Sequence, residues 1–123
     1  MPIFEVWDVV KVPFPYTDRP VRERRPALVL GAGPIQERHG LLWVMMITSA
    51  KNRGWLDDVE ISDLEGAGLP AASVVRTAKI ATIEVGDAER IGSLPIGDRA
   101  EVGARVAETV AKVLGVPKKK EKR

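Results

Sequence analysis

Up to residue 85 the apolar residues of this chain come in short runs, and this feature constrains the fold more than any other. Most runs are rich in β-branched side chains, and they end at glycine, proline or a polar stretch. Runs of this length are typical of β-strands and too short for most helices. The sequence therefore predicts strands at residues 7–12, 27–30, 41–47, 58–61, 73–76 and 80–85. Residues 13–25, which contain three prolines and several arginines, are expected to form a loop, and residues 66–70 a turn.

Near the C-terminus the apolar spacing changes from that of a strand to that of a helix. Valines at positions 102, 106, 110 and 113, with a leucine at 114, fall on one face at helical spacing. Asp98 and Glu101 form a plausible capping box, and Gly115 followed by Pro117 supplies a stop. We expect a helix of about four turns. The fold class is mainly β (α+β): a small antiparallel barrel or curled sheet with one C-terminal helix packed on it. Trp43, Met45 and Met46 are expected in its core.

The length of 123 residues fits one domain, predicted to span residues 1–117. Residues 118–123 carry five positive charges and one negative, so the rest of the chain has a net charge of −2 although the total is +2. We expect this basic tail to be a disordered, solvated end, with a contribution to polyanion binding as the alternative. Cysteine is absent, and neither a signal peptide nor a membrane span is recognisable, so a cytoplasmic protein is expected.

Several classes of chemistry find no support in the sequence. No glycine-rich phosphate loop is present, and no cluster has the spacing of a zinc or di-metal site, so neither a metal nor another cofactor is expected. The single histidine, His39, lies in a predicted turn and is interpreted as an exposed residue. An enzyme built from this chain would rely on arginines, hydroxyls, carboxylates and backbone groups. That set suits phosphoryl transfer, in which positioning and charge stabilisation dominate.

The arginines of the predicted loop are concentrated just before a strand. Arg24 and Arg25 end the cluster, and only Pro26 separates Arg25 from the apolar run that follows. Proline restricts the preceding residue to extended backbone, which would aim the Arg25 side chain. A guanidinium matches the oxygens of a phosphate and stays charged at any working pH. Arg25 is therefore either a phosphate-binding residue or a loop arginine paired with Glu23 or Asp18.

Three ordered segments resemble the MazF/PemK family of toxin endoribonucleases. They are VVKVPFPYTD at 9–18, RRPALVL at 24–30 and MITSA at 46–50, and the resemblance continues through 67–70, 73–76 and 80–83. It covers roughly residues 7–114. The resemblance implies an SH3-like curled antiparallel sheet, a homodimer, and metal-independent cleavage of single-stranded RNA. It also implies inhibition by a partner antitoxin whose flexible segment fills the active groove.

The same resemblance assigns roles to individual residues. Arg25 would be the arginine before proline and Thr48 the threonine at the strand end, both catalytic, with Ser49 beside them in substrate binding. The chemistry is reasonable, because negative charge builds on phosphorus when the 2′-hydroxyl attacks, and Thr48 can donate to the same oxygens as Arg25. Such cleavage leaves a 2′,3′-cyclic phosphate and a 5′-hydroxyl.

This chain departs from the family at several positions. Pro20 stands where one branch has an acidic residue, so Asp18 and Glu23 are the remaining acid or base candidates. Another branch carries Arg-x-Asp on the later strand, where this chain has Arg76-Thr77-Ala78. Arg76 is a candidate for phosphate contact, with a cross-strand salt bridge as the alternative, and the general base is unassigned. The usual glycine before the first aspartate is Trp7 here.

Further substrate-binding candidates follow the Thr-Ser step. Lys51, Arg53 and Trp55 lie in a polar loop together with Asn52. Basic and aromatic side chains hold single-stranded nucleic acid through backbone charge and base stacking, and Arg24 is expected to contribute charge as well. A solvated loop with Trp55 folded onto the core is the alternative.

The function predicted from the sequence is that of an endoribonuclease toxin, and a different class of function stays open. The alternative is a non-catalytic binding module of the same fold, on the pattern of the CcdB-type gyrase poisons. A structural protein without a ligand would leave Arg25 and Thr48 unexplained.

Overall fold

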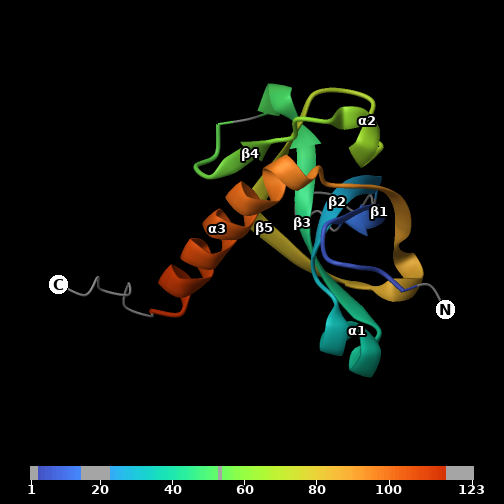
Figure 1. Ribbon diagram of the computed structural model, residues 1–123. Helices are drawn as coiled ribbons and strands as arrows, with labels where there is room; N and C mark the ends of the chain where they lie inside the picture. The colour runs from blue at the N-terminus through green and yellow to red at the C-terminus, as the bar shows by residue number, and fades with distance from the viewer. Residues whose placement is uncertain (1–2, 15–22, 53, 116–123) are drawn as a thin grey trace.

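The structure is a computed structural model that describes residues 3–14, 23–52 and 54–115 (Figure 1). The side chains of Phe14 and Glu23 are outside this description. The strands are β1 (Asp8–Phe14), β2 (Glu23–Gly31), β3 (Leu41–Ser49), β4 (Asp58–Glu60), β5 (Ser73–Glu84) and β6 (Glu89–Ser93). The helices are α1 (Gly33–His39), α2 (Leu64–Ala67) and α3 (Ile96–Val113), with short 3₁₀ turns η1 (Ala50–Asn52) and η2 (Val85–Asp87).

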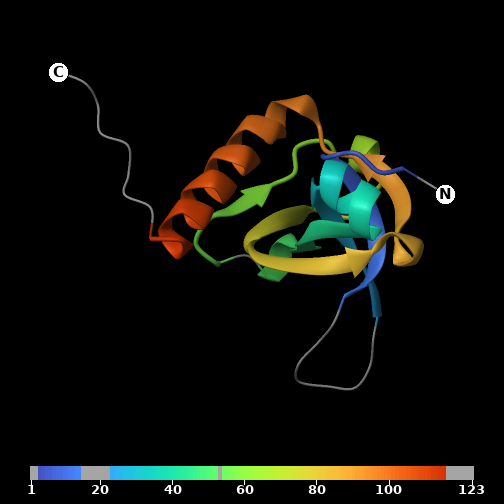
Figure 2. The same cartoon turned by 90° about the horizontal axis from the view of Figure 1, so that it is seen from below.

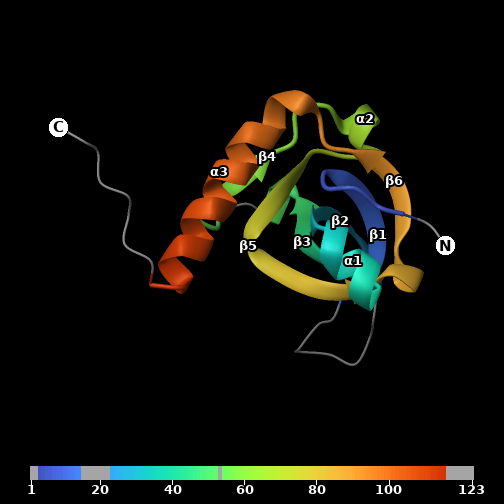
Figure 3. The ribbon, with the colours of Figure 1, turned by 60° about the horizontal axis from the view of Figure 1, so that its bottom comes forward.

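The described strands form one antiparallel sheet in the order β4-β5-β3-β2-β1-β6. The two outermost strands, β4 and β6, do not pair with each other, so the sheet curls without closing into a barrel (Figure 3). Helix α3 crosses the β4 end of the sheet, and α2 packs near β6 (Figures 1 and 2). The predicted class, a curled antiparallel sheet with a C-terminal helix, is confirmed.

The sheet is covered on both faces, and this explains why its central strands are apolar without interruption. Along β2, Ala27 and Val29 join one buried cluster while Leu28 between them joins the other. The cluster that contains Leu28 also includes Val102 and Val106 of α3, and the opposite cluster includes Phe4 of the N-terminal segment. Successive strand residues point to opposite faces, so a run that is apolar throughout requires packing on both sides.

Helix α3 begins earlier than predicted, and the expected capping box is wrong. Pro95 occupies the N-cap position, which places Asp98 inside the first turn. The Asp98 carboxylate instead accepts hydrogen bonds from the backbone N–H and the hydroxyl of Ser62, at 2.8 and 3.1 Å. Asp98 thus ties the start of the helix to the segment that follows β4. At the other end the helix stops as predicted, with Gly115 at a φ of 71°.

Other sequence predictions need correction. Strand β2 begins at Glu23, inside the predicted loop, because residues 23–26 pair with β1. The predicted turn at 37–40 is the end of α1, and α2 and β6 were not predicted. Met45 and Met46 are buried as predicted, but Trp43 is half-exposed. Its partner on the neighbouring strand is Gly31, which has no side chain to cover the ring.

Candidate active site

Strand register brings Arg25 and Thr48 to the same end of the sheet. Toward this end the pairing of β2 with β3 stops at Ala27 and Met46, which are opposite each other and belong to the same buried cluster on one face of the sheet. Two residues further along each strand come Arg25 and Thr48, and alternation directs both to that same face. Arg25 is half-buried and pairs with Val12 of β1. Two polar residues from separate strands therefore lie on one face and at one end of the sheet, just beyond the last apolar pair.

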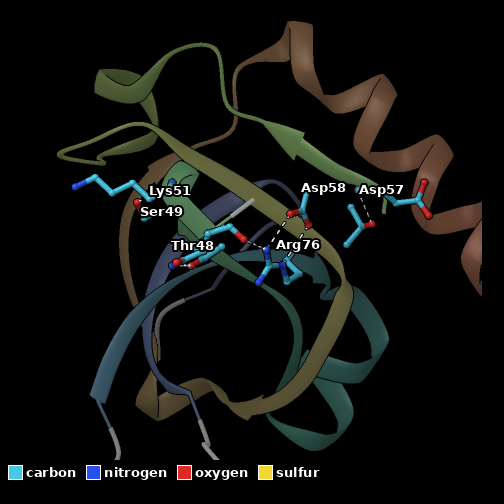
Figure 4. Close-up of polar contacts among 8 residues, drawn as sticks. Thr48, Ser49, Lys51, Asp57, Asp58 and Arg76 are labelled. Carbon is cyan, nitrogen blue, oxygen red and sulfur yellow. Dashed lines mark hydrogen bonds and ion pairs between the residues drawn. The ribbon is translucent and has the colours of Figure 1, made fainter. Parts of the chain in front are cut away.

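The Thr48 hydroxyl is held from the turn that follows it. Its Oγ1 accepts a hydrogen bond of 3.1 Å from the side-chain amide of Asn52, across η1. Thr48 is only 5% exposed, whereas Asn52 and Ser49 are exposed. The Ser49 hydroxyl accepts from the backbone N–H of Lys51 at 3.2 Å, which shapes the turn at the end of β3. Figure 4 shows Thr48, Ser49 and Lys51 together at this strand end.

Arg76 lies on β5 beside this turn and is almost completely buried. Its cross-strand partner in β4 is Asp58, and the two side chains form a fork: Nε donates to Oδ1 at 3.2 Å and Nη2 to Oδ2 at 2.9 Å (Figure 4). Nη2 also donates to the backbone carbonyl of Asn52 at 2.7 Å. The Trp55 ring covers the guanidinium, with its centroid 4.2 Å from Cζ. The alternative interpretation of Arg76, a cross-strand salt bridge, describes this contact.

The remaining candidates are placed less closely together. Lys51 is exposed on η1, and Trp55 is 50% exposed in the loop before β4. Arg24 faces away from Arg25: its Nη2 donates to the Lys11 carbonyl at 3.2 Å and to Glu89 of β6 at 3.4 Å. Asp18 and Arg53 lie outside the described residues, as does the side chain of Glu23.

Sequence reasoning missed the roles of Asn52 and Asp58. The sequence presents Asn52 only as one polar residue of a loop, because its hydrogen bond to Thr48 depends on η1, a turn of three residues. Asp58 opens an alternating strand segment opposite in charge to Arg76, and that complementarity was the available signal. It did not identify the pair, because nothing local in the sequence says that β4 lies beside β5.

The loop that carries Trp55 is fixed on its other side by α3. Asp57, at a φ of 76°, accepts from Nη1 of Arg105 at 3.0 Å, and its carbonyl accepts from the Thr77 hydroxyl at 3.0 Å. Arg105 also donates to Glu101 at 2.8 Å. Hydrogen bonding to Glu101 raises the pKa of Arg105, so its charge is constant at any working pH.

Other features of the described residues suggest no second centre. No three histidine, cysteine, aspartate or glutamate side chains gather there as metal ligands, and no described helix is long and apolar enough to cross a membrane. A cavity of about 610 Å³ lies between the N-terminal segment and α1, where Phe4 and Gln36 line it. None of the predicted site residues lines this cavity.

Comparisons with known proteins identify the family and the fold of this chain. The family model described as "PemK-like, MazF-like toxin of type II toxin-antitoxin system" matches residues 5–110. MazF from Deinococcus radiodurans (Form-I) superimposes with a TM-score of 0.70 and 23% identity, covering 94% of this chain and 99% of that one.

Two complexes are also similar. A MazE–MazF complex from the same organism (Form-II) superimposes with a TM-score of 0.68 and 23% identity, covering 95% of this chain and 100% of that one. An endoribonuclease in complex with its cognate antitoxin from a mycobacterial species superimposes with a TM-score of 0.68 and 14% identity. The match covers 97% of this chain and 100% of that one. At such identities the likeness of these structures establishes the fold. No curated protein sequence matches.

Proposed function

This chain belongs to the family of PemK-like, MazF-like toxins of type II toxin–antitoxin systems, and we propose that it is an endoribonuclease that cleaves single-stranded RNA. Two proteins of similar structure from mycobacterial species are endoribonucleases, one of them bound to its cognate antitoxin. The observation that carries the proposal is the register of β2 and β3, which directs Arg25 and Thr48 to one end and one face of the sheet.

The proposed reaction needs only groups of these types. The 2′-hydroxyl gives its proton to a base as its oxygen attacks the adjacent phosphorus, the P–O5′ bond breaks, and the departing 5′-oxygen takes up a proton. A 2′,3′-cyclic phosphate and a 5′-hydroxyl result. Arg25 would neutralise the charge that develops on the phosphate oxygens. Thr48 would donate its hydroxyl hydrogen to the same group, because its oxygen already accepts from Asn52. No metal ion takes part in this scheme.

The base that takes the 2′-hydroxyl proton is unassigned. Asp58 is engaged by Arg76 in the fork described above, so it is poorly suited to this task. Glu23 and Asp18 are the candidates that the sequence offers near Arg25. Exposed Ser49, Lys51 and Trp55, with Arg53, would bind the flanking nucleotides by charge and stacking, whereas Arg24 faces away from this site.

The partners follow from the family. We expect a cognate antitoxin that inhibits the toxin, and a homodimer as the active form. MazE–MazF complexes among the similar structures support the antitoxin.

The proposal is tested by RNA cleavage in EDTA with the wild type, Arg25→Ala and Thr48→Ala. Arg38→Ala is the matched control, because Arg38 is an exposed arginine on α1. We expect discrete fragments ending in cyclic phosphate, a loss of about 10²–10³-fold in Arg25→Ala, and wild-type cleavage in Arg38→Ala. RNA binding without cleavage would replace the proposal by the binding module, and cleavage that survives Arg25→Ala would remove Arg25 from the mechanism.

A further inference from the structure

The hydrogen bond on Thr48 decides which way its hydroxyl can donate. A hydroxyl has one hydrogen to donate and two lone pairs. Since Asn52 Nδ2 donates to Oγ1 at 3.1 Å, one lone pair is occupied and the hydrogen is directed elsewhere. Thr48 is 5% exposed, so few other orientations are available to the side chain. The orientation of the hydroxyl therefore depends on where Asn52 lies.

Asn52 is in turn held by Arg76. The Asn52 side chain is exposed on a single turn of 3₁₀ helix, a short element that does little to fix a side chain by itself. Arg76 Nη2 donates to the Asn52 carbonyl at 2.7 Å, the shortest of the hydrogen bonds at this strand end. A charged donor makes a stronger bond to a carbonyl than a neutral one does. The turn is thereby fixed to the neighbouring strand β5.

Arg76 is held in place from two sides. Asp58 binds both Nε and Nη2, and Trp55 covers the guanidinium plane. Arg76 and Asp58 are both nearly buried, with 9% and 8% of their side-chain surfaces exposed. Withdrawing either partner would leave an uncompensated buried charge. The contacts of Arg76 thus favour a role inside the protein over direct contact with RNA.

We propose that Asp58, Arg76 and Asn52 form a positioning chain that orients the Thr48 hydroxyl for RNA cleavage. In this chain Asp58 fixes Arg76 (Figure 4), Arg76 fixes the Asn52 backbone, and the Asn52 amide fixes Thr48. All three are positioning residues that act through Thr48. The inference rests on the proposed endoribonuclease function; it adds Asn52 and Asp58 to the site and gives Arg76 a positioning role in place of phosphate contact.

The first test compares the steady-state cleavage kinetics of Asn52→Ala and Arg76→Lys. Lysine keeps the charge beside Asp58 but lacks the planar fork through which Arg76 binds both Asp58 oxygens and also reaches the Asn52 carbonyl. Each variant breaks the chain at one residue, so we expect kcat to fall about tenfold while KM stays within about twofold, since ground-state RNA binding is retained. Asn52 is exposed, so Asn52→Ala decides the question even where Arg76→Lys unfolds.

Arg105→Lys is the matched control. Arg105 forms the equivalent arginine pair with Asp57, next to Asp58, and its hydrogen bonds go to Asp57 and Glu101. A purely structural effect of weakening an arginine–aspartate pair would appear in both arginine variants. We expect wild-type kcat in Arg105→Lys.

A double-mutant cycle and an NMR measurement separate positioning from other roles. In the Asn52→Ala background, Arg76→Lys should change kcat by less than about twofold, because the route to Thr48 is already cut. The side-chain amide signals of Asn52 should shift in Arg76→Lys and stay unchanged in Arg105→Lys.

Three results would overturn the positioning chain. They are wild-type kcat in Asn52→Ala, an equal effect of Arg76→Lys with and without Asn52, and a raised KM in Arg76→Lys at unchanged kcat. Each leaves Arg25-dependent cleavage by the wild type intact, so the proposed function would survive. A wild type that does not cleave RNA would instead overturn the proposed function and the positioning chain together.

Discussion

Trp55 combines a fixed orientation with an exposed surface, which suits it to stack on a base. One side of the ring lies against the Arg76 guanidinium at 4.2 Å, yet half of the residue is exposed. An aromatic ring immobilised in this way loses little conformational entropy when a base stacks on it. Stacking of this kind contributes about 1–3 kcal/mol per base.

We therefore predict that Trp55→Leu weakens binding of single-stranded RNA about tenfold, whereas Trp55→Phe keeps most of the affinity. Fluorescence anisotropy with a fully 2′-O-methylated oligoribonucleotide measures binding without cleavage. Leu56→Ala is the control, because Leu56 is the exposed neighbour in the same loop and has no aromatic face. Equal RNA affinities of Trp55→Leu and Leu56→Ala would show that Trp55 does not stack on a base and only packs on Arg76.

At the level of single residues, sequence predicted chemical type better than contact partners. The spacing of Arg25 and Thr48 relative to their strand ends was readable, since each lies at a boundary between polar and apolar residues. The partner of Arg76 was not, because Asp58 is far away in sequence.

Trp7 illustrates a second limit of the sequence. It stands where the family usually has glycine, and its φ is 82°, in the left-handed region that favours glycine. Two backbone hydrogen bonds hold it there: the Trp7 N–H donates to the Val29 carbonyl at 3.0 Å, and the Trp7 carbonyl accepts from the Leu94 N–H at 2.8 Å. No pattern in the sequence reports a backbone angle imposed by such distant neighbours.

Among the elements, α3 contains an internal glycine that its packing does not require. A Cβ at Gly103 would lie 3.8 Å from the Trp7 ring, which is ordinary contact distance. Glycine costs a helix roughly 0.5–1 kcal/mol relative to alanine. We predict that Gly103→Ala raises the free energy of unfolding by about 1 kcal/mol and Tm by about 4 °C, measured by thermal and denaturant unfolding.

Gly68→Ala is the contrasting variant for the same measurement. Gly68 has a φ of 74°, and a Cβ there would collide with the carbonyl of Ile91 on β6. Both the backbone strain and the collision destabilise the fold, so Tm should fall. A stabilising Gly68→Ala, or a destabilising Gly103→Ala, would contradict this account of the two glycines.

Elements were predictable where burial imposes a pattern and missed where it does not. Helix α1 has no buried residue and so no apolar period, although Pro34 at its start and Gly40 after its end were usable signals. Strand β6 lies at the sheet edge and is joined to β1 by backbone bonds, which are independent of side-chain pattern.

Strand β5 was predicted as two strands because residues 77–79 interrupt its apolar pattern. In the structure the β3 partners change from Arg76 to Ile80 between Met46 and Met45, so those residues form an irregularity inside one bent strand. Thr77 is buried at this bend and donates to the Asp57 carbonyl, a contact that no local pattern announces.

For the molecule as a whole, the same sheet must support a core and present a site. Its curl (Figure 3) lets both faces pack against apolar residues, while Arg25 and Thr48 lie beyond the end of one apolar cluster. The same logic leaves one apolar surface uncovered. The face of α3 that buries Val102 and Val106 continues to Val113 and Leu114, which are 78% and 70% exposed.

The exposed end of α3 leads to a prediction about the expected homodimer. Large apolar side chains gathered on a surface favour association because burial removes them from water. Sedimentation equilibrium at micromolar concentration should give about twice the monomer mass of 13.4 kDa. Val113→Lys should raise the dissociation constant of the dimer about tenfold or more, since the lysine charge would have to be desolvated in the interface. Ala104→Lys, an exposed position on the opposite face of α3, should leave it unchanged. A monomeric wild type would contradict the expected homodimer. A dimer that tolerates Val113→Lys would place the interface away from the end of α3.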